Sequence, residues 1–444
     1  MSNRVMDGSI LEALVKTTAL FVRNICSICY SSASHWQLQS LISRTLVFLT
    51  SGLLALIATG SSAMFSKAEH RIAAELQLEE CFSSDQSGPP QANQNSVGTI
   101  TSQSIQDLSG KVYYVSNSGR DRNSGDASSP FQTIQTAIDK ANPGDAIYIC
   151  SGHYDAIVID GKRGTASQPI LVAAYPGHEQ AVSISTATYD RGAAIKIKES
   201  AYIVIRGLKA TKSLWGIYVT NSHNVTLSSN IVDNIGQEAI RFREDSSYGE
   251  IVNNTISNTG QRKGFSQYGE GIYLGAGRPN YPGEAASEIL IRGNEISHTT
   301  AEAIDIKSFV HNVVVEENII HDINTARSGA IVVGINATDE SDFTNSDNVV
   351  IRNNTIQNIS RTSQWLDGNA IKVQSSATIQ GNKISNYQHR GIFVENARSD
   401  NSFRIYDNQL CRRDDSGSHG DIVVSETDAH VALGNNTVRH VSNQ

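Results

Sequence analysis

Charged residues are scarce in this 444-residue chain, of which they make up 18%, against about 25% in an average soluble domain. Basic residues are fewer than acidic ones, 36 against 44, and the formal net charge is −8. A nucleic-acid-binding protein normally carries a basic surface, so this composition argues against nucleic acid as a partner. Hydrophobic residues still make up 39% of the chain, which is enough for a packed core and excludes a wholly disordered protein.

Several motifs of catalysis and metal binding are also missing. The sequence has no Gly-x-Ser-x-Gly turn and no Gly-x-x-x-x-Gly-Lys-Ser/Thr phosphate loop, which argues against an α/β-hydrolase and a P-loop nucleotide-binding protein. Cys26 and Cys29 form a lone Cys-x-x-Cys pair, so a zinc site is not expected. The other three cysteines, Cys81, Cys150 and Cys411, allow one disulfide but exclude a disulfide scaffold.

No charge at all occurs between Thr45 and Ser66, an apolar run long enough to span a bilayer. Charges before this run are net positive and charges after it net negative, so we expect the N-terminus inside the cell and the rest outside. We interpret 1–44 as a leader, 45–66 as a membrane anchor or cleaved signal, and 67–108 as a linker rich in Ser, Gln and Asn. The alternative for 45–66 is a buried helix. We therefore expect a secreted, periplasmic or cell-surface protein that contacts the membrane only through 45–66.

Helical periodicity is absent after residue 200, and a repeat of short strands takes its place. Each repeat has alternating apolar residues, then Asn, then another apolar residue, as in NVTLSSNIVDN from Asn224. The recurring asparagines are Asn230, Asn254, Asn294, Asn318, Asn354, Asn382, Asn408 and Asn436. Short strands at such a period are typical of a parallel β-helix, a solenoid in which each repeat is one coil.

We therefore predict an all-β domain over 109–440, a monomeric parallel β-helix of about 8–10 coils. Alternate apolar residues such as Ile240 and Phe242 are expected to point inward and stack from coil to coil. The asparagines are expected to sit at a turn and form an internal hydrogen-bonded ladder. Extra loops are expected in the coils that contain 260–285 and 336–347.

The segment 111–155 lacks this repeat and has the pattern strand, loop, helix, strand. Pro130 is predicted at the first helical position, after Ser128 or Ser129 as the cap. The apolar residues that would share one helix face are Phe131, Ile134, Ile138 and Ala141. We expect this short helix to cover the open N-terminal end of the solenoid.

A second recurring phrase places charged residues in register. Two positions before an inward-pointing Ile stand Glu238, Glu270 and Glu302, and just after it stand Arg241, Arg243, Tyr273, Asp305 and Lys307. Coils stack about 4.8 Å apart, and at an effective dielectric of about 20 neighbouring carboxylates at that distance repel by roughly 3 kcal/mol. We expect the nearby Arg and Lys residues or a hard cation, best calcium, to compensate. The alternative is a solvated ladder of salt bridges.

The run YYVS…GRDRNSG…SPFQTIQTAIDKANPGDAIYI…GHY, followed by PILVAAYPG, resembles the opening of extracellular right-handed β-helix proteins. That superfamily includes the pectate lyases and the chondroitinase-B-like and alginate-type polysaccharide lyases. The segment AEAIDIKSFVHNVVVEENII, 301–320, resembles the calcium and base strand of the chondroitinase-B-like lyases. This resemblance implies Lys307 as the base and Glu302 as a calcium ligand. Thr300 and Gly334 stand where that family has an acid and an arginine.

A β-elimination on a uronate needs a cation beside the carboxylate, a base and a proton donor. We predict a calcium-dependent lyase that acts on an acidic polysaccharide. The predicted roles are catalytic for Lys307, Arg243 and Arg241, calcium binding for Glu302, Glu270, Asp305 and Glu238, and substrate binding for Tyr273, Lys372 and Arg327. The alternatives are a glycoside hydrolase that uses paired carboxylates such as Glu270 and Glu302, and a non-catalytic glycan-binding or adhesion module.

Overall fold

The computed structural model describes residues 110–275, 285–307, 309–325, 328–334, 346–361, 368–395, 397, 399–413, 420–425 and 429–441. The predicted leader, apolar segment and linker, together with Cys26, Cys29 and Cys81, therefore lie outside the described residues. Within the described ranges no helix has both the length and the apolarity to span a bilayer.

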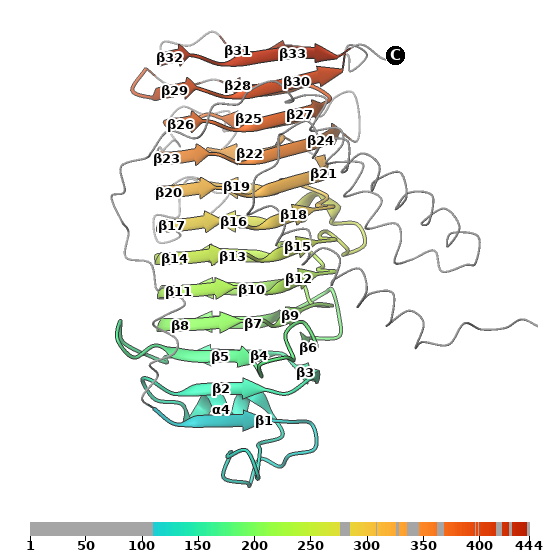
Figure 1. Cartoon of the computed structure of the whole chain (residues 1–444), viewed down its shortest axis with the longest axis vertical. Coiled ribbons are helices and arrows are strands. Elements are labelled where there is room, and N and C mark those ends of the chain that lie inside the picture. Colours follow the sequence, from blue (N-terminus) through green and yellow to red (C-terminus); the bar gives the residue numbers. More distant parts are fainter. Residues whose placement is uncertain are drawn as a thin grey trace, which may run out of the picture. The chain divides into compact units, whose positions relative to one another are not determined.

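Three parallel β-sheets wind around a common core, with one strand of each sheet in a typical coil (Figure 1). We call them sheet 1, with ten strands, sheet 2, with twelve, and sheet 3, with eleven. One coil runs from β10 (Trp215–Thr220) in sheet 1 to β11 (His223–Ser228) in sheet 2 and β12 (Ile231–Asp233) in sheet 3. The predicted parallel β-helix is confirmed.

The other strands of sheet 1 are β4 (Ile157–Asp160), β7 (Ala193–Lys198), β13 (Ile240–Arg243), β16 (Ile272–Leu274), β19 (Ile304–Ile306), β22 (Gly329–Val333), β25 (Asn369–Val373), β28 (Arg390–Val394) and β31 (Gly420–Val424). Those of sheet 2 are β1 (Val112–Val115), β2 (Ala146–Ile149), β5 (Ile170–Ala174), β8 (Ala201–Arg206), β14 (Ser246–Val252), β17 (Ala286–Arg292), β20 (Val310–Glu316), β23 (Asp347–Arg352), β26 (Ala377–Gln380), β29 (Ser402–Tyr406) and β32 (His430–Gly434). Those of sheet 3 are β3 (Gly152–Asp155), β6 (Val182–Ser185), β9 (Lys209–Ala210), β15 (Thr255–Ser257), β18 (Glu295–Ser297), β21 (Ile319–Thr325), β24 (Thr355–Arg361), β27 (Lys383–Tyr387), β30 (Gln409–Arg413) and β33 (Thr437–Val441).

Sheets 2 and 3 contain more strands than the 8–10 coils predicted. The additional coils come from the chain before Asn230, where β1 to β9 lie. That part of the chain folds into the same coils without the Asn repeat, so a count of asparagines misses it.

Inward-pointing aliphatic residues form the core in continuous columns. In sheet 1, Ile217 pairs with Ile240, and Ile240 with Ile272. All three are fully buried, and each contributes about 1.5–3 kcal/mol relative to exposure. The residues between these inward-pointing ones therefore point outward, where they can form a site, as predicted.

The asparagine ladder lies at the turn between sheets 2 and 3. The amide oxygen of Asn254 accepts from the backbone N–H and side-chain Nδ2 of Asn230, at 2.9 and 3.1 Å. The same pair of bonds recurs from each ladder residue to the next, as far as Asn436. The left-handed backbone conformation falls on the residue before, for example Asn253 at φ 56° and Glu317 at φ 57°. Side-chain bonding, not backbone tolerance, therefore explains the ladder asparagines.

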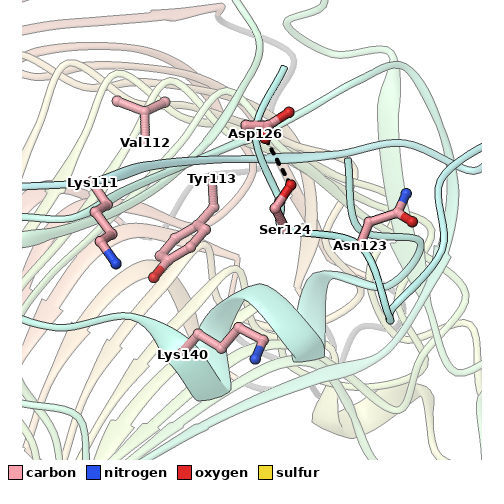
Figure 2. Close-up of a pocket in the computed structure, with 8 residues that line it drawn as sticks. Lys111, Val112, Tyr113, Asn123, Ser124, Asp126 and Lys140 are labelled. Carbon is pink, nitrogen blue, oxygen red and sulfur yellow. Dashed lines mark hydrogen bonds between the residues drawn. The ribbon is translucent and has the colours of Figure 1, made fainter. Parts of the chain in front are cut away.

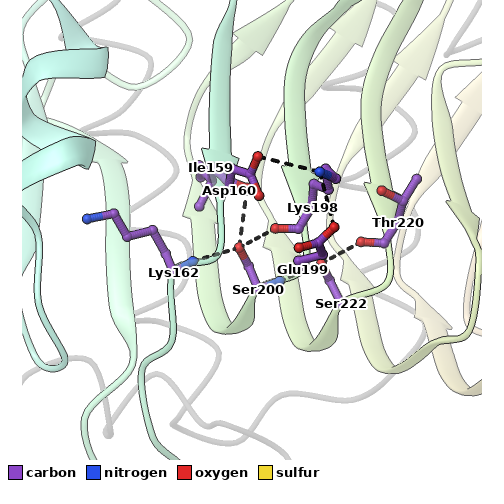
Figure 3. A network of polar contacts seen from close by, with 8 residues as sticks. All are labelled: Ile159, Asp160, Lys162, Lys198, Glu199, Ser200, Thr220 and Ser222. Atoms are coloured by element: carbon purple, nitrogen blue, oxygen red, sulfur yellow. Dashed lines mark hydrogen bonds and ion pairs between the residues drawn. The ribbon is translucent and has the colours of Figure 1, made fainter.

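A second ladder, of serines, lies at the turn between sheets 1 and 2 and was not predicted. The backbone N–H of Lys162 donates to Ser200 Oγ at 3.1 Å, and that of Ser200 to Ser222 Oγ at 3.0 Å (Figure 3). The backbone N–H of Ser222 in turn donates to Ser246 Oγ at 3.4 Å. Because each bond satisfies a buried turn N–H, these serines tie successive coils together.

The helix α4 (Ile134–Lys140) packs against β1, β2 and β4 at the N-terminal end, where a capping helix was predicted. It begins later than predicted, with Thr133 as the N-cap instead of Ser128 or Ser129. Phe131 is fully buried but extended, and its backbone exchanges hydrogen bonds with β1 through Tyr114 and Ser116. Those bonds hold the chain out of the helix until Thr133.

Candidate active site on sheet 1

Three adjacent strands of sheet 1 carry the predicted site residues on their outward side. Pairing of β13 with β16 and of β16 with β19 places Arg241, Tyr273 and Asp305 side by side. Their neighbours in each strand point into the core, because side chains alternate along a strand. Sheet 1 therefore gathers these residues from positions 32 apart in the chain, as the columns in the sequence predicted.

The column of Glu238, Glu270 and Glu302 lies just before these strands. The backbone carbonyl of Glu270 accepts from Ala239 N–H and that of Glu302 from Gly271 N–H, both at 3.0 Å. The residue between each Glu and the inward Ile is small, and at Gly271 a Cβ would lie 2.5 Å from the Ala303 oxygen. Glycine therefore lets the backbones of these two coils approach closely at this position.

Glu270, Glu302 and Asp305 converge, with one carboxylate oxygen of each within 4.8 Å of the others. Their exposed fractions are 5%, 5% and 0%. Among the described residues, buried Glu270 Oε2 and Asp305 Oδ1 have no hydrogen-bond partner. Burial raises the pKa of Glu270 well above its ordinary value, and Glu238 and Glu302 raise it further. Burial also raises the pKa of Asp305. Three carboxylates so placed need a positive charge to be ionised together.

Lys307 provides one such charge, since its Nζ lies 2.6 Å from Asp305 Oδ2. Burial alone would lower the pKa of Lys307, but Asp305 and Glu302 raise it above its ordinary value. The ammonium also lies 5.7 Å from the centre of the Tyr273 ring. Burial raises the pKa of the Tyr273 phenol, so it stays protonated.

Arg241 is held between aromatic rings, a feature that sequence reasoning missed. Its guanidinium carbon lies 4.9 Å from the ring centres of Trp215 and Tyr218 and 5.4 Å from that of Tyr273. Its Nε lies 3.7 Å from Glu238 Oε1, so Glu238 pairs with Arg241. Glu238 is not one of the three carboxylates whose oxygens lie within 4.8 Å of one another, although its charge raises the pKa of Glu270. In the sequence, Trp215 occupies the column of Glu238, and Tyr218 occupies the column of Arg241. These positions were the available sign that the rings lie beside Arg241.

The remaining predicted residues lie at varying distances from the cluster. Arg243 lies in the same column as Lys307 but two coils earlier, level with Thr220. Lys372 lies two strands beyond β19, where its Nζ is 2.6 Å from Glu395 Oε2. Arg327 lies outside the described residues.

A pocket of about 560 Å³ lies elsewhere, beside the capping helix, with Lys111, Tyr113 and Lys140 in its lining (Figure 2). Its carboxylate, Asp126, accepts hydrogen bonds from Ser124 and Ser128 in its own loop. That side chain is occupied in holding the loop, so the pocket offers no comparable reactive group.

The carboxylate cluster has the donor set of a site for a hard divalent cation. Calcium takes oxygen ligands only, from carboxylates and carbonyls. Glu270, Glu302 and Asp305 present such oxygens at close range, two of them unpartnered and buried. The residues present thus fit calcium, and a cation there would relieve the repulsion among them.

Comparison with known proteins identifies the fold family. Residues 113–281 match the family described as Pel9A-like, right-handed β-helix region, and residues 283–438 match the right-handed β-helix region family. The chain belongs to the right-handed parallel β-helix superfamily. The handedness implied by the sequence resemblance is thereby confirmed.

Relatives of known activity include polysaccharide lyases. Pectate lyase PEL9 of Emericella nidulans is 30% identical over 125 residues, which are 25% of this chain and 30% of that protein, so the match spans less than a third of the relative's length. An alginate lyase from Paenibacillus sp. FPU-7 superposes with a TM-score of 0.54 at 25% identity, over 67% of this chain and 95% of that one. A lacto-N-biosidase from Eubacterium ramulus matches at 13% identity with a TM-score of 0.49, over 74% and 69% of the two chains.

Proposed function

We propose that this chain is a cation-dependent polysaccharide lyase that cleaves a uronate-containing glycan by β-elimination outside the cytoplasm. The observation that carries the proposal is the convergence of Glu270, Glu302 and Asp305, with Lys307 Nζ 2.6 Å from Asp305. The pectate lyase and alginate lyase relatives support the reaction class.

Glu270, Glu302 and Asp305 would hold calcium on the outer face of sheet 1. Bound calcium would neutralise the substrate carboxylate and so make the adjacent C5 proton more acidic. Its positive charge beside Lys307 would also lower the pKa of that amine, which Asp305 and Glu302 otherwise raise. A neutral amine is what a general base requires.

Lys307 would then remove the C5 proton of the sugar. The C4–O4 bond breaks as a C4–C5 double bond forms, and the electron pair leaves with O4. The Tyr273 phenol, which burial keeps protonated, would donate a proton to that oxygen. Arg241, fixed by three aromatic rings, would bind a sugar carboxylate or hydroxyl without having to be ordered first.

A glycoside hydrolase is the second candidate, favoured by one observation. Oxygens of Glu270 and Glu302 lie within 4.8 Å, near the separation of about 5–5.5 Å between the carboxyl groups of retaining hydrolases. The raised pKa of Glu270 would suit the acid of such a pair.

Ultraviolet absorbance of the unsaturated product decides between them. The protein is incubated with alginate, pectate and chondroitin, with calcium or with a chelator. We expect absorbance to rise on at least one substrate, to stop with chelator, and to fall by about 10²–10⁴-fold in Lys307→Ala. Reducing ends without the absorbance would indicate the hydrolase, and no product from any acidic glycan would refute both enzymes.

A further inference from the structure

Further along sheet 1, the position that holds glutamate in three coils holds an arginine instead. Arg390 stands two residues before the inward Ile392, as Glu302 does before Ile304, and its coil is the third after that of Glu302. The two coils between carry Gly329 and Asn369 at this position. A positive side chain thus occupies the line of the carboxylate cluster, three steps of about 4.8 Å away.

The Arg390 guanidinium lies over an aromatic ring, and one of its nitrogens has no hydrogen-bond partner among the described residues. Its guanidinium carbon lies 4.0 Å from the centre of the Phe393 ring. Within the part of the chain that the structure describes, its buried Nε has no hydrogen-bond partner. Because Nε is buried, an anion from outside would bind the terminal Nη groups of Arg390, which the ring keeps in place.

The neighbouring histidine does not supply the missing acceptor. Nη1 of Arg390 lies 3.2 Å from His389 Nδ1, but that nitrogen is 3.1 Å from Asn369 Oδ1. Asn369 Nδ2 donates to the Ser328 carbonyl at 2.9 Å, which turns Oδ1 toward the ring. His389 Nδ1 therefore donates to Asn369, and it has no lone pair left for Arg390.

Glu395, which follows Arg390 in the same coil, is bound to other residues. Glu395 Oε2 lies 2.6 Å from Lys372 Nζ and accepts from Gln374 Nε2 at 3.1 Å. Glu395 is thus committed to Lys372, which is 2% exposed. The positive charge of Arg390 is left for a partner from outside.

We propose that Arg390 binds the carboxylate of an acidic sugar about three units from the bond that is cleaved. The inference rests on the proposed function, since it takes the polymer to run along sheet 1 past Lys307. One coil is similar in length to one sugar unit, so three coils correspond to about three units. A guanidinium binds a carboxylate through two parallel hydrogen bonds, which selects a charged sugar over a neutral one.

Calorimetric binding to Lys307→Ala protein, which prevents turnover, tests the proposal. The probes are a hexasaccharide and a disaccharide from alginate and from pectate, and a neutral hexasaccharide. Adding Arg390→Gln should weaken acidic hexasaccharide binding by about tenfold, and Arg390→Lys by less. Disaccharide binding should be unchanged. Arg404→Gln, in β29 of sheet 2, is the matched control and should change nothing.

Equal hexasaccharide binding with and without Arg390, or an equal loss for the disaccharide, would overturn the proposal, as would failure of both hexasaccharides to bind the parent protein. Loss of hexasaccharide binding in a protein without lyase activity would support Arg390 as a binding residue and refute only the reaction. Should Arg390→Gln fail to fold, Phe393→Leu removes the ring beneath the guanidinium and should give a smaller loss of the same kind.

Discussion

Two of the polar columns along this solenoid, the asparagine ladder and the glutamate column, differ in chemistry. The asparagine ladder is neutral, and each amide both donates and accepts. The column of Glu238, Glu270 and Glu302 is built from groups of one charge that can only accept. Glu238 Oε2 and Glu270 Oε2 are buried and have no hydrogen-bond partner in the part of the chain that the structure describes.

Stacking one residue type along a β-helix therefore has opposite consequences in the two places. An amide column satisfies itself and contributes stability with each coil. A carboxylate column accumulates repulsion unless a counter-charge is bound. The first column needs nothing beyond the chain, whereas the second is completed by Lys307, Arg241 and, in our proposal, a cation.

Breaking the neutral ladder should give the largest effect on stability. Asn318→Ala removes bonds to Ile291 and Asn354 and the acceptor for two N–H groups of Asn294. Because these groups stay buried, we expect the free energy of unfolding to fall by about 4 kcal/mol. Denaturant unfolding monitored by circular dichroism measures it.

The control for this ladder variant lies in a neighbouring turn of the same kind. Asn353→Gly keeps an exposed left-handed position and leaves the ladder intact, so stability should change by less than about 1 kcal/mol. A similar loss in both variants would mean that the turn backbone, and not the ladder, provides the stability.

Replacing a carboxylate of the glutamate column by an amide should have the second largest effect on stability. In chelator, Glu270→Gln removes one of the crowded charges, and we expect about 1–2 kcal/mol of added stability at neutral pH. Calcium at a hundredfold excess over its Kd should stabilise the wild type by about 2.7 kcal/mol and the variant by much less. Thermal unfolding with and without calcium measures both.

Asp160→Asn, an exposed carboxylate on the same sheet, is the control for this experiment. Its response to calcium should match that of the wild type. If calcium stabilised Glu270→Gln as strongly as the wild type, the cluster would not be the cation site.

The columns of the site could be predicted from the sequence because a β-helix converts regular spacing into contact. Once the inward Ile is known, Glu270, Glu302 and Asp305 must fall on neighbouring coils. The choice of partner could not be predicted, because it depends on side-chain directions. Glu238 pairs with Arg241, and Lys372 pairs with Glu395 two coils from the cluster.

Parts of the fold and site that lack a repeated residue type were missed, because they depend on tertiary contacts and not on regular spacing. The Asn repeat marks coils only after residue 224, so the coils of β1 to β9 were undercounted. The helix start was misplaced because Pro130 and Phe131 fit a helix locally, while the strand pairing of Phe131 is a tertiary contact. The aromatic rings around Arg241 come from the two neighbouring coils, Trp215 and Tyr218 from β10 and Tyr273 from β16. Their meeting is a tertiary contact that depends on side-chain directions.

His321 is a half-buried charge that already has carboxylate partners, in contrast to the glutamate column. We expect it to have the smallest effect on stability. His321 lies 2.8 Å from Asp322 and 3.4 Å from Glu295. Burial alone would lower its pKa, but these two carboxylates raise it to about 9. Since the pKa is raised on folding, the stabilisation is complete below about pH 6.5 and is lost as the pH rises toward 9. We expect a loss of about 1 kcal/mol between pH 7 and 9, because solvent screens the half-exposed Glu295. In His321→Gln this decline should be absent, while in His311→Gln, which alters an exposed ion pair, it should persist. If stability still declined between pH 7 and 9 in His321→Gln, the decline would come from other groups, such as the carboxylate column, and not from His321.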